Sequence, residues 1–248
     1  MTTPFDPANI KQDFAVHSAL DRNFWPTDDK LNPTVRKGLL IIAKMFVDSL
    51  DKPVQVKDVR LTGSVANYNY SRFSDVDLHI ILDFDKLSSD RSVVEEYLAL
   101  KKNQWNTTHH IKMYGHVVEV YAEDVGATHI ATGLYSVLKD EWIKIPSPKQ
   151  PKFDPGDVAT KAVYFKNLYS VLVRRFKLKK YNAVIRSINQ TKEQIRNMRQ
   201  SGLKKDGEFS TENLAFKVLR RSGLLGKLTD LKNKAIDAKM TIESERNS

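Results

Sequence analysis

Residues 61–82 read LTGSVANYNYSRFSDVDLHIIL, and the second half of this stretch places two carboxylates at the start of a strand. VDLHIIL has the apolar content of a buried strand, yet Asp75 and Asp77 stand one residue apart at its head. Because alternate side chains of a strand share a face, both aspartates and His79 should lie on one face, with the aliphatic residues on the other. Two ionised carboxylates so close repel each other unless a cation lies between them. Oxygen ligands of this kind suit Mg²⁺, so the stretch predicts a metal site beside a sheet core.

The first half of the stretch ends a strand with Gly63 and Ser64. We expect a short helix or turn over residues 64–70. If a helix begins there, its free backbone N–H groups and the Ser64 hydroxyl can bind an anion, and Gly63 lets the backbone approach a phosphate closely. Ten residues separate Ser64 from Asp75, enough for one turn and a return loop. A phosphate site and a metal site are therefore predicted side by side, which is the minimum needed to hold a nucleoside triphosphate.

A third carboxylate is expected because phosphoryl-type transfer favours a second metal ion. Glu119 lies between Val118 and Val120 in the strand-like run HVVEVYA, which should neighbour the first pair. Glu123 and Asp124 fall past that expected strand and rank second. The alternative is that Glu119 is a solvent-facing strand residue without a chemical role.

Taken together, these elements resemble the signature of the DNA polymerase beta-like nucleotidyltransferase superfamily. That signature is a hydrophobic residue with Gly-Ser, a spacer, Asp-hydrophobic-Asp, and a later carboxylate between hydrophobic residues; here it spans residues 61–120. The wording LTGSVANYNYSRFSDVDLH is also similar to a group of predicted nucleotidyltransferases encoded by tailed phages, whose place of action is the host cytoplasm.

The resemblance implies a short mixed sheet flanked by helices, and two Mg²⁺ ions that Mn²⁺ could replace. Carried over by position, Gly63 and Ser64 would hold the β- and γ-phosphates. Asp75 and Asp77 would bind both metals. Glu119 would complete the site and help to activate the attacking hydroxyl.

One departure from the family pattern concerns the triphosphate. Members that polymerise or add tails often have a basic residue soon after Gly-Ser. Here Asn67 stands three residues after the serine, and the nearest basic residue is Arg72. Both residues are retained as candidates for nucleotide binding.

Outside this signature, the sequence predicts the order helix, strand, helix, strand, helix, hairpins, linker and helices. Asn32 and Pro33 predict a helix start, because an N-cap side chain is followed by proline in the first turn. A serine is expected to cap the helix that begins in SSDRSVVEEY at 88–97. Hairpin turns are expected at 114–115 and at 139–141.

The run PSPKQPKFDPGD at 146–157 is dense in proline and charge, and it is the best domain boundary in the chain. We therefore predict an α/β (α+β) nucleotidyltransferase domain with a small mixed sheet over residues 1–148. A basic α-helical domain should follow over residues 149–248, with roughly three helices and a break at GLKKDGEF, residues 202–209. Residues 1–31 show little periodicity.

Charge is divided unevenly along the 248 residues. Residues 1–148 carry 17 Lys and Arg against 20 Asp and Glu, a net charge of −3, whereas residues 149–248 carry 23 against 10, a net charge of +13. This asymmetry predicts a polyanionic partner, most simply a nucleic acid; the alternative is a solvated, lysine-rich helix surface. The candidate contacts, which could instead hold the triphosphate tail, are Arg174, Arg175, Lys179, Lys180, Arg220 and Arg221.

Other signals narrow the class of protein. There is no cysteine, which excludes disulfides and thiolate metal sites. The opening MTTPFDPANIKQDF lacks a signal-peptide pattern and no apolar run is long enough to span a membrane, so a cytoplasmic protein is expected. P-loop, nucleophile-elbow and dinucleotide-binding motifs are absent.

The sequence thus predicts a metal-dependent enzyme that transfers a nucleoside monophosphate from an NTP, with ATP favoured, to a hydroxyl and releases pyrophosphate. RNA, for example a tRNA end, is the favoured acceptor because of the basic C-terminal half. The alternative is a nucleotide- or nucleic-acid-binding module that keeps the fold without turnover. A glycosyltransferase that uses D-x-D to hold a sugar nucleotide is a weaker alternative, because it would not need Gly-Ser at that distance.

Overall fold

The structure is a computed structural model that describes residues 4–127, 131–148 and 152–246. It divides into two compact units. One is Phe14–Gln150, which we call the sheet unit. The other combines Met1–Asp13 with Pro151–Ser248, and we call it the helical unit. The chain therefore starts in the helical unit, forms the whole sheet unit, and then returns.

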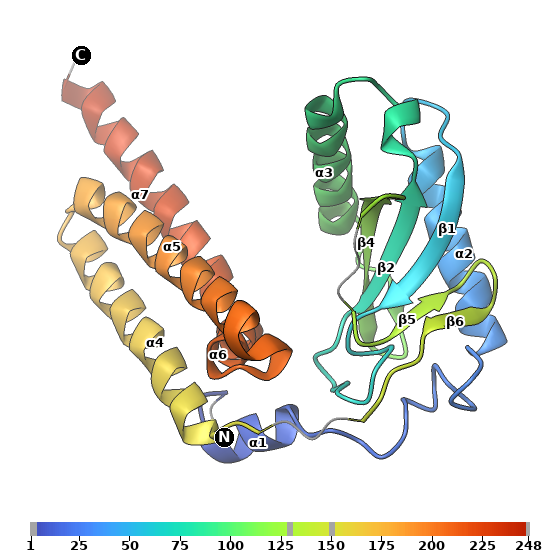
Figure 1. The fold of residues 1–248 in the computed structure, drawn as a ribbon. Coiled ribbons are helices and arrows are strands. Elements are labelled where there is room, and N and C mark those ends of the chain that lie inside the picture. Colours follow the sequence, from blue (N-terminus) through green and yellow to red (C-terminus); the bar gives the residue numbers. More distant parts are fainter. Residues whose placement is uncertain (1–3, 128–130, 149–151, 247–248) are drawn as a thin grey trace. The chain divides into compact units, whose positions relative to one another are not determined.

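The sheet unit is built on a mixed six-stranded sheet (Figure 1). Its strands are β1 (Val56–Thr62), β2 (Val76–Leu82), β3 (Lys112–Met113), β4 (His116–Asp124), β5 (Leu134–Ser136) and β6 (Glu141–Lys144). Their order is β3-β4-β2-β1-β5-β6, with β2 and β4 parallel and the other pairs antiparallel. With the helices around it, this sheet confirms the predicted α/β class with a mixed sheet.

Helix α2 (Pro33–Asp48) covers one face of the sheet and begins where the sequence predicts (Figure 1). The Asn32 side chain accepts a hydrogen bond of 2.9 Å from the Thr34 N–H, and Pro33 occupies the first turn. Its apolar stripe, which includes Leu39 and Phe46, is fully buried against the strands. Full burial of one such side chain contributes about 2 kcal/mol, so this helix fixes which face of the sheet becomes the core.

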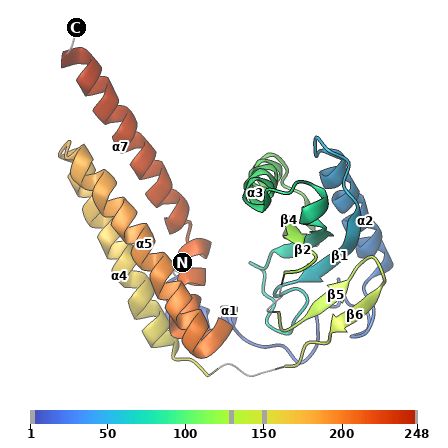
Figure 2. The same ribbon diagram turned by 45° about the horizontal axis from the view of Figure 1, so that its top comes forward.

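Helix α3 (Arg91–Thr108) lies beside β4 and follows a short 3₁₀ turn, η1 (Phe84–Lys86) (Figure 2). The predicted serine cap is wrong. Asp90 caps the helix, because its carboxylate accepts hydrogen bonds from the N–H groups of Ser92 (3.1 Å) and Val93 (3.3 Å). A negative charge at a helix N-terminus also interacts favourably with the helix dipole, which a serine hydroxyl cannot match.

Two hairpin turns complete the sheet: the first lies where the sequence predicts it, and the second, predicted at 139–141, covers residues 137–140 because Glu141 already belongs to β6. The β3–β4 turn has positive φ at Tyr114 (48°) and Gly115 (88°), as tight hairpin turns require. The β5–β6 turn ends at Asp140, which also has a positive φ, of 61°.

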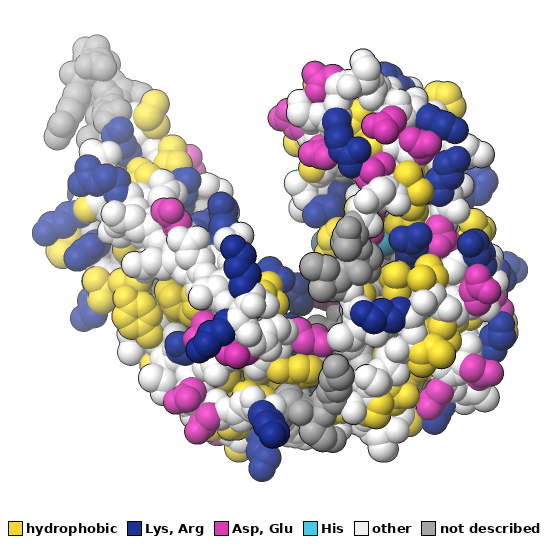
Figure 3. Space-filling view, viewed as in Figure 1, with side chains coloured by type: hydrophobic (Ala, Val, Ile, Leu, Met, Phe, Trp, Pro, Cys, Tyr) yellow, Lys and Arg dark blue, Asp and Glu magenta, His cyan; other side chains and the backbone are white. Residues whose placement is uncertain are grey.

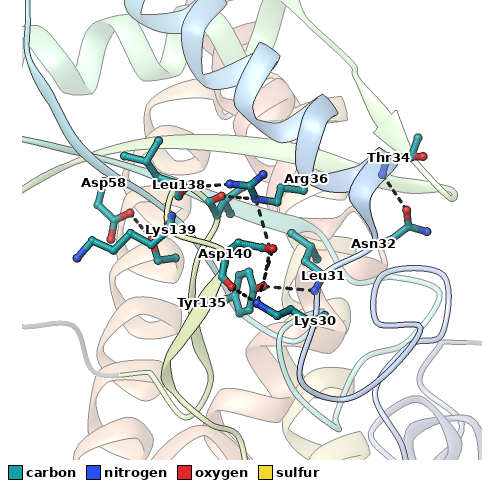
Figure 4. Close-up of polar contacts among 12 residues, drawn as sticks. Lys30, Leu31, Asn32, Thr34, Arg36, Asp58, Tyr135, Leu138, Lys139 and Asp140 are labelled. Atoms are coloured by element: carbon teal, nitrogen blue, oxygen red, sulfur yellow. Dashed lines mark hydrogen bonds and ion pairs between the residues drawn. The ribbon is translucent and has the colours of Figure 1, made fainter.

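Asp140 joins this second turn to α2 and to the segment before it (Figure 4). Its carboxylate accepts a 2.7 Å hydrogen bond from the Tyr135 hydroxyl and lies 3.3 Å from Arg36 Nε and 3.7 Å from Lys30 Nζ. Arg36 also donates to the backbone oxygen of Val137 at 2.9 Å. Burial and the Asp140 carboxylate raise the pKa of Tyr135, so the phenol stays protonated and keeps donating.

The helical unit contains α1 (Pro7–Asp13), α4 (Pro155–Lys177), α5 (Tyr181–Asp206), the 3₁₀ turn η2 (Gly207–Phe209), α6 (Thr211–Arg221) and α7 (Leu224–Arg246). Four α-helices follow residue 152 in the described part of the chain, where the sequence predicts roughly three. The predicted break at 202–209 is also too long. Helix α5 continues through Gly202, which is buried against Ser210 and Glu212, and the break comes at Gly207, with a φ of 74°.

Helix α1 packs on α4 and buries Ile10. The sequence grouped these first residues with the sheet because seven residues hold too little periodicity to reveal a tertiary partner. Within the described ranges, none of the helices combines the length and the apolar content that a membrane crossing requires.

Candidate active site on the polar sheet face

Strand register brings Asp77 and Glu119, two of the predicted site residues, together on the face of the sheet opposite the core. Asp77 on β2 is the direct partner of Thr62 on β1 and of Glu119 on β4. The next residues on the same face are Arg60, His79 and Tyr121, which are also register partners across the three strands. Along β2 and β4 the alternate residues are fully buried, for example Leu78 and Val120, whereas Asp77, His79, Glu119 and Tyr121 are only partly buried. We call the partly buried side the polar face.

Gly63 lies directly against the Asp77 carboxylate. Its φ is 77°, and a Cβ built on it would lie 1.9 Å from Asp77 Oδ2. A larger residue would therefore meet both backbone strain and a steric clash. The sequence pointed to Gly63 because a phosphate could approach it; the structure adds that the glycine makes room for an acidic side chain.

Ser64 begins a loop of turns, and no helix follows it. Its hydroxyl donates a 2.7 Å hydrogen bond to Ser74 Oγ, which also accepts from the N–H of Ser71 at 2.9 Å. The backbone oxygen of Ser74 lies 2.7 Å from Nδ1 of the buried His116. These contacts fix the start and the end of the loop together, and Asp75 follows directly. The helix N-terminus that would offer several N–H groups to an anion is not formed.

Asn67 and Arg72, the other nucleotide candidates, occupy different environments in this loop. Asn67 is buried: its Oδ1 accepts from the N–H of Tyr68 at 2.8 Å, and its Nδ2 donates to Thr132 Oγ1. Arg72 is exposed, with its guanidinium carbon 4.6 Å from the centre of the Phe73 ring. Asn67 therefore ties the loop to the segment before β5, whereas Arg72 is accessible to a ligand.

Glu119 has a partner that the sequence did not suggest. The Tyr121 hydroxyl donates a short hydrogen bond to Glu119 Oε2. The Tyr121 ring stacks on His79, with centroids 4.8 Å apart and an angle of 17°, and Lys102 Nζ lies 4.8 Å from the Tyr121 ring centre. His79 Nδ1 in turn lies 2.9 Å from Glu123 Oε2.

Strand β4, which contains Glu119, is longer than predicted, so Glu123 and Asp124 lie within the strand and not past its end. Because β4 continues to Asp124, Glu119, Tyr121 and Glu123 alternate onto the same polar face. Counting in steps of two from Glu119 could have found both residues. Asp124 is buried and structural: Arg91 Nη2 at 2.8 Å and the N–H of Phe84 at 3.1 Å hold the pKa of its carboxyl below the usual value.

The donor set on the polar face fits a divalent cation in kind. Asp77 and Glu119 supply only carboxylate oxygens, and as register partners on neighbouring strands they lie about 5 Å apart. Asp75, the third predicted ligand, lies just before β2, so strand register does not place it. In the described ranges, however, no three His, Asp or Glu side chains converge closely enough to hold a metal ion. Asp77 and Glu119 are therefore neighbours through their backbone, while the Glu119 carboxylate is engaged by Tyr121.

The six predicted nucleic-acid contacts do not form one patch. Arg174, Arg175, Lys179 and Lys180 are exposed around the α4–α5 turn. Arg220 and Arg221 end α6, at the other end of the helical unit (Figure 1). Arg221 Nη1 lies 3.9 Å from Asp13 Oδ2 and is mostly buried. Lys and Arg side chains are spread over the visible surface of the helical unit (Figure 3).

Part of the chain is similar to a known protein family. The family model described as "Nucleotidyltransferase domain" matches residues 43–132, a range that contains β1 to β4 and all the residues of the polar face discussed above. A search of curated proteins found no match, and neither did a search of solved structures. None of these comparisons supports the narrower resemblance to phage proteins.

Proposed function

We propose that this protein transfers a nucleoside monophosphate from an NTP to a hydroxyl acceptor and releases pyrophosphate. The observation that carries the proposal is the alignment of Asp77 with Glu119 across parallel strands, with Gly63 against Asp77, inside the range that matches the nucleotidyltransferase model. The family match suggests the reaction type, and the register supports the residues that perform it.

In the proposed reaction, the acceptor oxygen attacks the α-phosphorus and the bond to the bridging oxygen breaks, so that pyrophosphate leaves. Gly63, Ser64 and the exposed Arg72 would bind the outer phosphates. Glu119 would accept the hydroxyl proton, and for this its carboxylate has to turn from Tyr121. Two Mg²⁺ ions, or Mn²⁺, held by Asp75, Asp77 and Glu119 would neutralise the developing charge.

RNA is the acceptor that we favour, with ATP as the donor. Support comes from the net charge of +13 on residues 149–248 and from the exposed group Arg174, Arg175, Lys179 and Lys180. Lys and Arg on a helical surface bind phosphodiester backbones without sequence preference, which suits an enzyme that must hold an RNA end.

The test is incubation of the purified protein with Mg²⁺, each α-³²P-labelled NTP in turn and total cellular RNA. Asp77→Asn is the inactive variant, and Asp85→Asn, an exposed carboxylate outside the polar face, is the matched control. We expect label in a discrete RNA band with wild type and Asp85→Asn, and none with Asp77→Asn. Label in protein or small molecules, lost in Asp77→Asn, would keep the reaction and replace the acceptor.

A second candidate is a nucleotide-binding module without turnover. It is favoured by two observations: in the described residues no three His, Asp or Glu side chains converge as a metal site requires, and Glu119 is hydrogen-bonded to Tyr121. If calorimetry shows that the protein binds NTP while no labelled product forms with any acceptor, this candidate is established and the transferase is rejected.

A further inference from the structure

The sheet unit begins with residues 14–25, which the structure describes in full and which form neither helix nor strand. They are nevertheless well packed, because Leu20, Phe24 and Trp25 are buried in the core of the sheet unit. They lie outside residues 43–132, the range that matches the nucleotidyltransferase model, so the family match gives them no role. We call residues 14–25 the bracing segment, because they hold the loop that carries the proposed nucleotide-binding residues.

The bracing segment supplies hydrogen-bond donors to the backbone of this loop, residues 64–74. Trp25 Nε1 donates to the backbone oxygen of Val65 at 2.8 Å in a buried hydrogen bond. His17 Nε2 donates to the backbone oxygen of Tyr70 at 2.9 Å, and the two rings stack with their centroids 4.0 Å apart. The His17 N–H donates to the carbonyl two residues before Tyr70, at 2.8 Å. Because a loop of turns has no ladder to pair its carbonyls, these donors from outside determine its path.

The end of the loop is held through His116, the first residue of β4. His116 Nδ1 lies 2.7 Å from the backbone oxygen of Ser74, and since a carbonyl only accepts, Nδ1 carries the hydrogen. On the other side of the ring, Nε2 lies 3.7 Å from Asp21 Oδ2 of the bracing segment. Asp21 is itself fixed, because its Oδ1 accepts from the N–H of Asn23 at 2.9 Å. His116 and Asp21 are both buried, so the imidazole has a defined orientation.

We propose that His116 is a positioning residue of the active site: it fixes the backbone of Ser74, so that Asp75 is placed to bind the metal complex of an NTP. Ser74 connects two parts of the site, because its Oγ accepts from Ser64, a proposed phosphate ligand, and its carbonyl leads directly into Asp75. A displaced Ser74 would therefore disturb both. The proposal rests on the proposed function only for the identity of the ligand, since binding needs no transfer.

The first experiment titrates the full chain with the Mg²⁺ complex of an ATP analogue that cannot be cleaved between the α- and β-phosphorus, followed by calorimetry. His116→Leu removes the donor to Ser74, whereas His116→Asn keeps an N–H donor near the position of Nδ1. We expect His116→Leu to bind the analogue about tenfold more weakly, with a matching rise in KM for ATP, and His116→Asn to keep most of the affinity. A role in stability alone would lower the melting temperature of His116→Leu and leave the affinity of the folded protein unchanged.

A second pair of variants covers the case of a His116→Leu protein that does not fold. His17→Ala removes an exposed side chain and, with it, the contacts that the ring makes with Tyr70. His110→Ala removes another exposed histidine of the sheet unit and is the matched control. We expect His17→Ala to weaken binding of the analogue and His110→Ala to leave it unchanged. Equal affinities in these two variants would overturn the role of the bracing segment.

The remaining outcomes separate this inference from the proposed function. Wild-type affinity in a folded His116→Leu protein, or equal losses in His116→Leu and His116→Asn, would overturn the role of His116. If wild type binds the analogue but transfers no label, and His116→Leu alone loses affinity, the positioning role stands and the transferase is rejected. If wild type transfers label and a folded His116→Leu protein keeps the KM and the affinity, the transferase stands and the positioning role is rejected. A wild-type protein that does not bind the analogue would overturn both.

Discussion

At Gly63 the backbone is left-handed and the Asp77 carboxylate occupies the space where a Cβ would stand. Gly63→Ala should therefore cost about 1–2 kcal/mol of unfolding free energy for the backbone alone, and more because Asp77 must move. Gly115→Ala is the control: its φ is also positive, at 88°, but nothing lies within 4 Å of a built Cβ. Urea unfolding of both variants measures the difference. Equal losses would contradict the close contact with Asp77.

Asp124, also in the sheet unit, makes a contribution to the unfolding free energy that should depend on pH. Arg91 and backbone N–H groups lower its pKa in the folded state, so its stabilising effect is present above the unfolded pKa and is lost as pH falls through the folded value. Asp124→Asn should lose about 1.5–3 kcal/mol at pH 7, and the gap to wild type should narrow below a pH of about 4. Asp85→Asn, exposed and 3.8 Å from the same arginine, should lose little at any pH. A gap that does not narrow at all as the pH falls from 7 to 3 would contradict the prediction.

At the scale of elements, α3 covers the open edge of β4. Asn106 donates to the backbone oxygen of Val120 and accepts from its N–H, both at 2.9 Å, so one side chain replaces a missing strand. Asn106→Leu should leave both backbone groups unpaired and lower the unfolding free energy by about 1–3 kcal/mol. It should also speed hydrogen exchange at the Val120 amide. Asn103→Leu, exposed one turn earlier, is the control. Similar losses of unfolding free energy in both variants would show that the loss does not come from the hydrogen bonds between Asn106 and Val120.

Sequence patterns predicted the elements best where the causes are local. The cap at Asn32, the turn at Tyr114 and Gly115, and the alternation of β2 all depend on a few adjacent residues. The pairing of Asp77 with Glu119 was expected only in outline, because register depends on partners distant in the chain. The hydrogen bond from Tyr121 to Glu119 depends on the conformations of the two side chains, which no residue pattern specifies.

At the scale of the whole molecule, the sheet unit is inserted between α1 and α4. A protease site placed after Ser147 should therefore, once cut, give two fragments that still co-elute, because α1 remains packed on α4 through Ile10. Ile10→Asp should release the fragments after the cut but not before it, since an unpaired buried charge is costly. Size-exclusion chromatography reads both results. Fragments that separate without the substitution would show that α1 is not part of the helical unit's core.

This insertion also orders events in time as the ribosome makes the chain. Helix α1 is synthesised before the sheet unit, yet α4, the helix on which it packs, comes only after the sheet unit. The nascent chain can therefore complete the polar face before α4, on which α1 packs, has been synthesised. Closing the helical unit then joins two segments that are linked through a folded unit instead of a flexible coil. Part of the entropy cost of bringing these two segments together is therefore met when the sheet unit folds, and not when α1 meets α4.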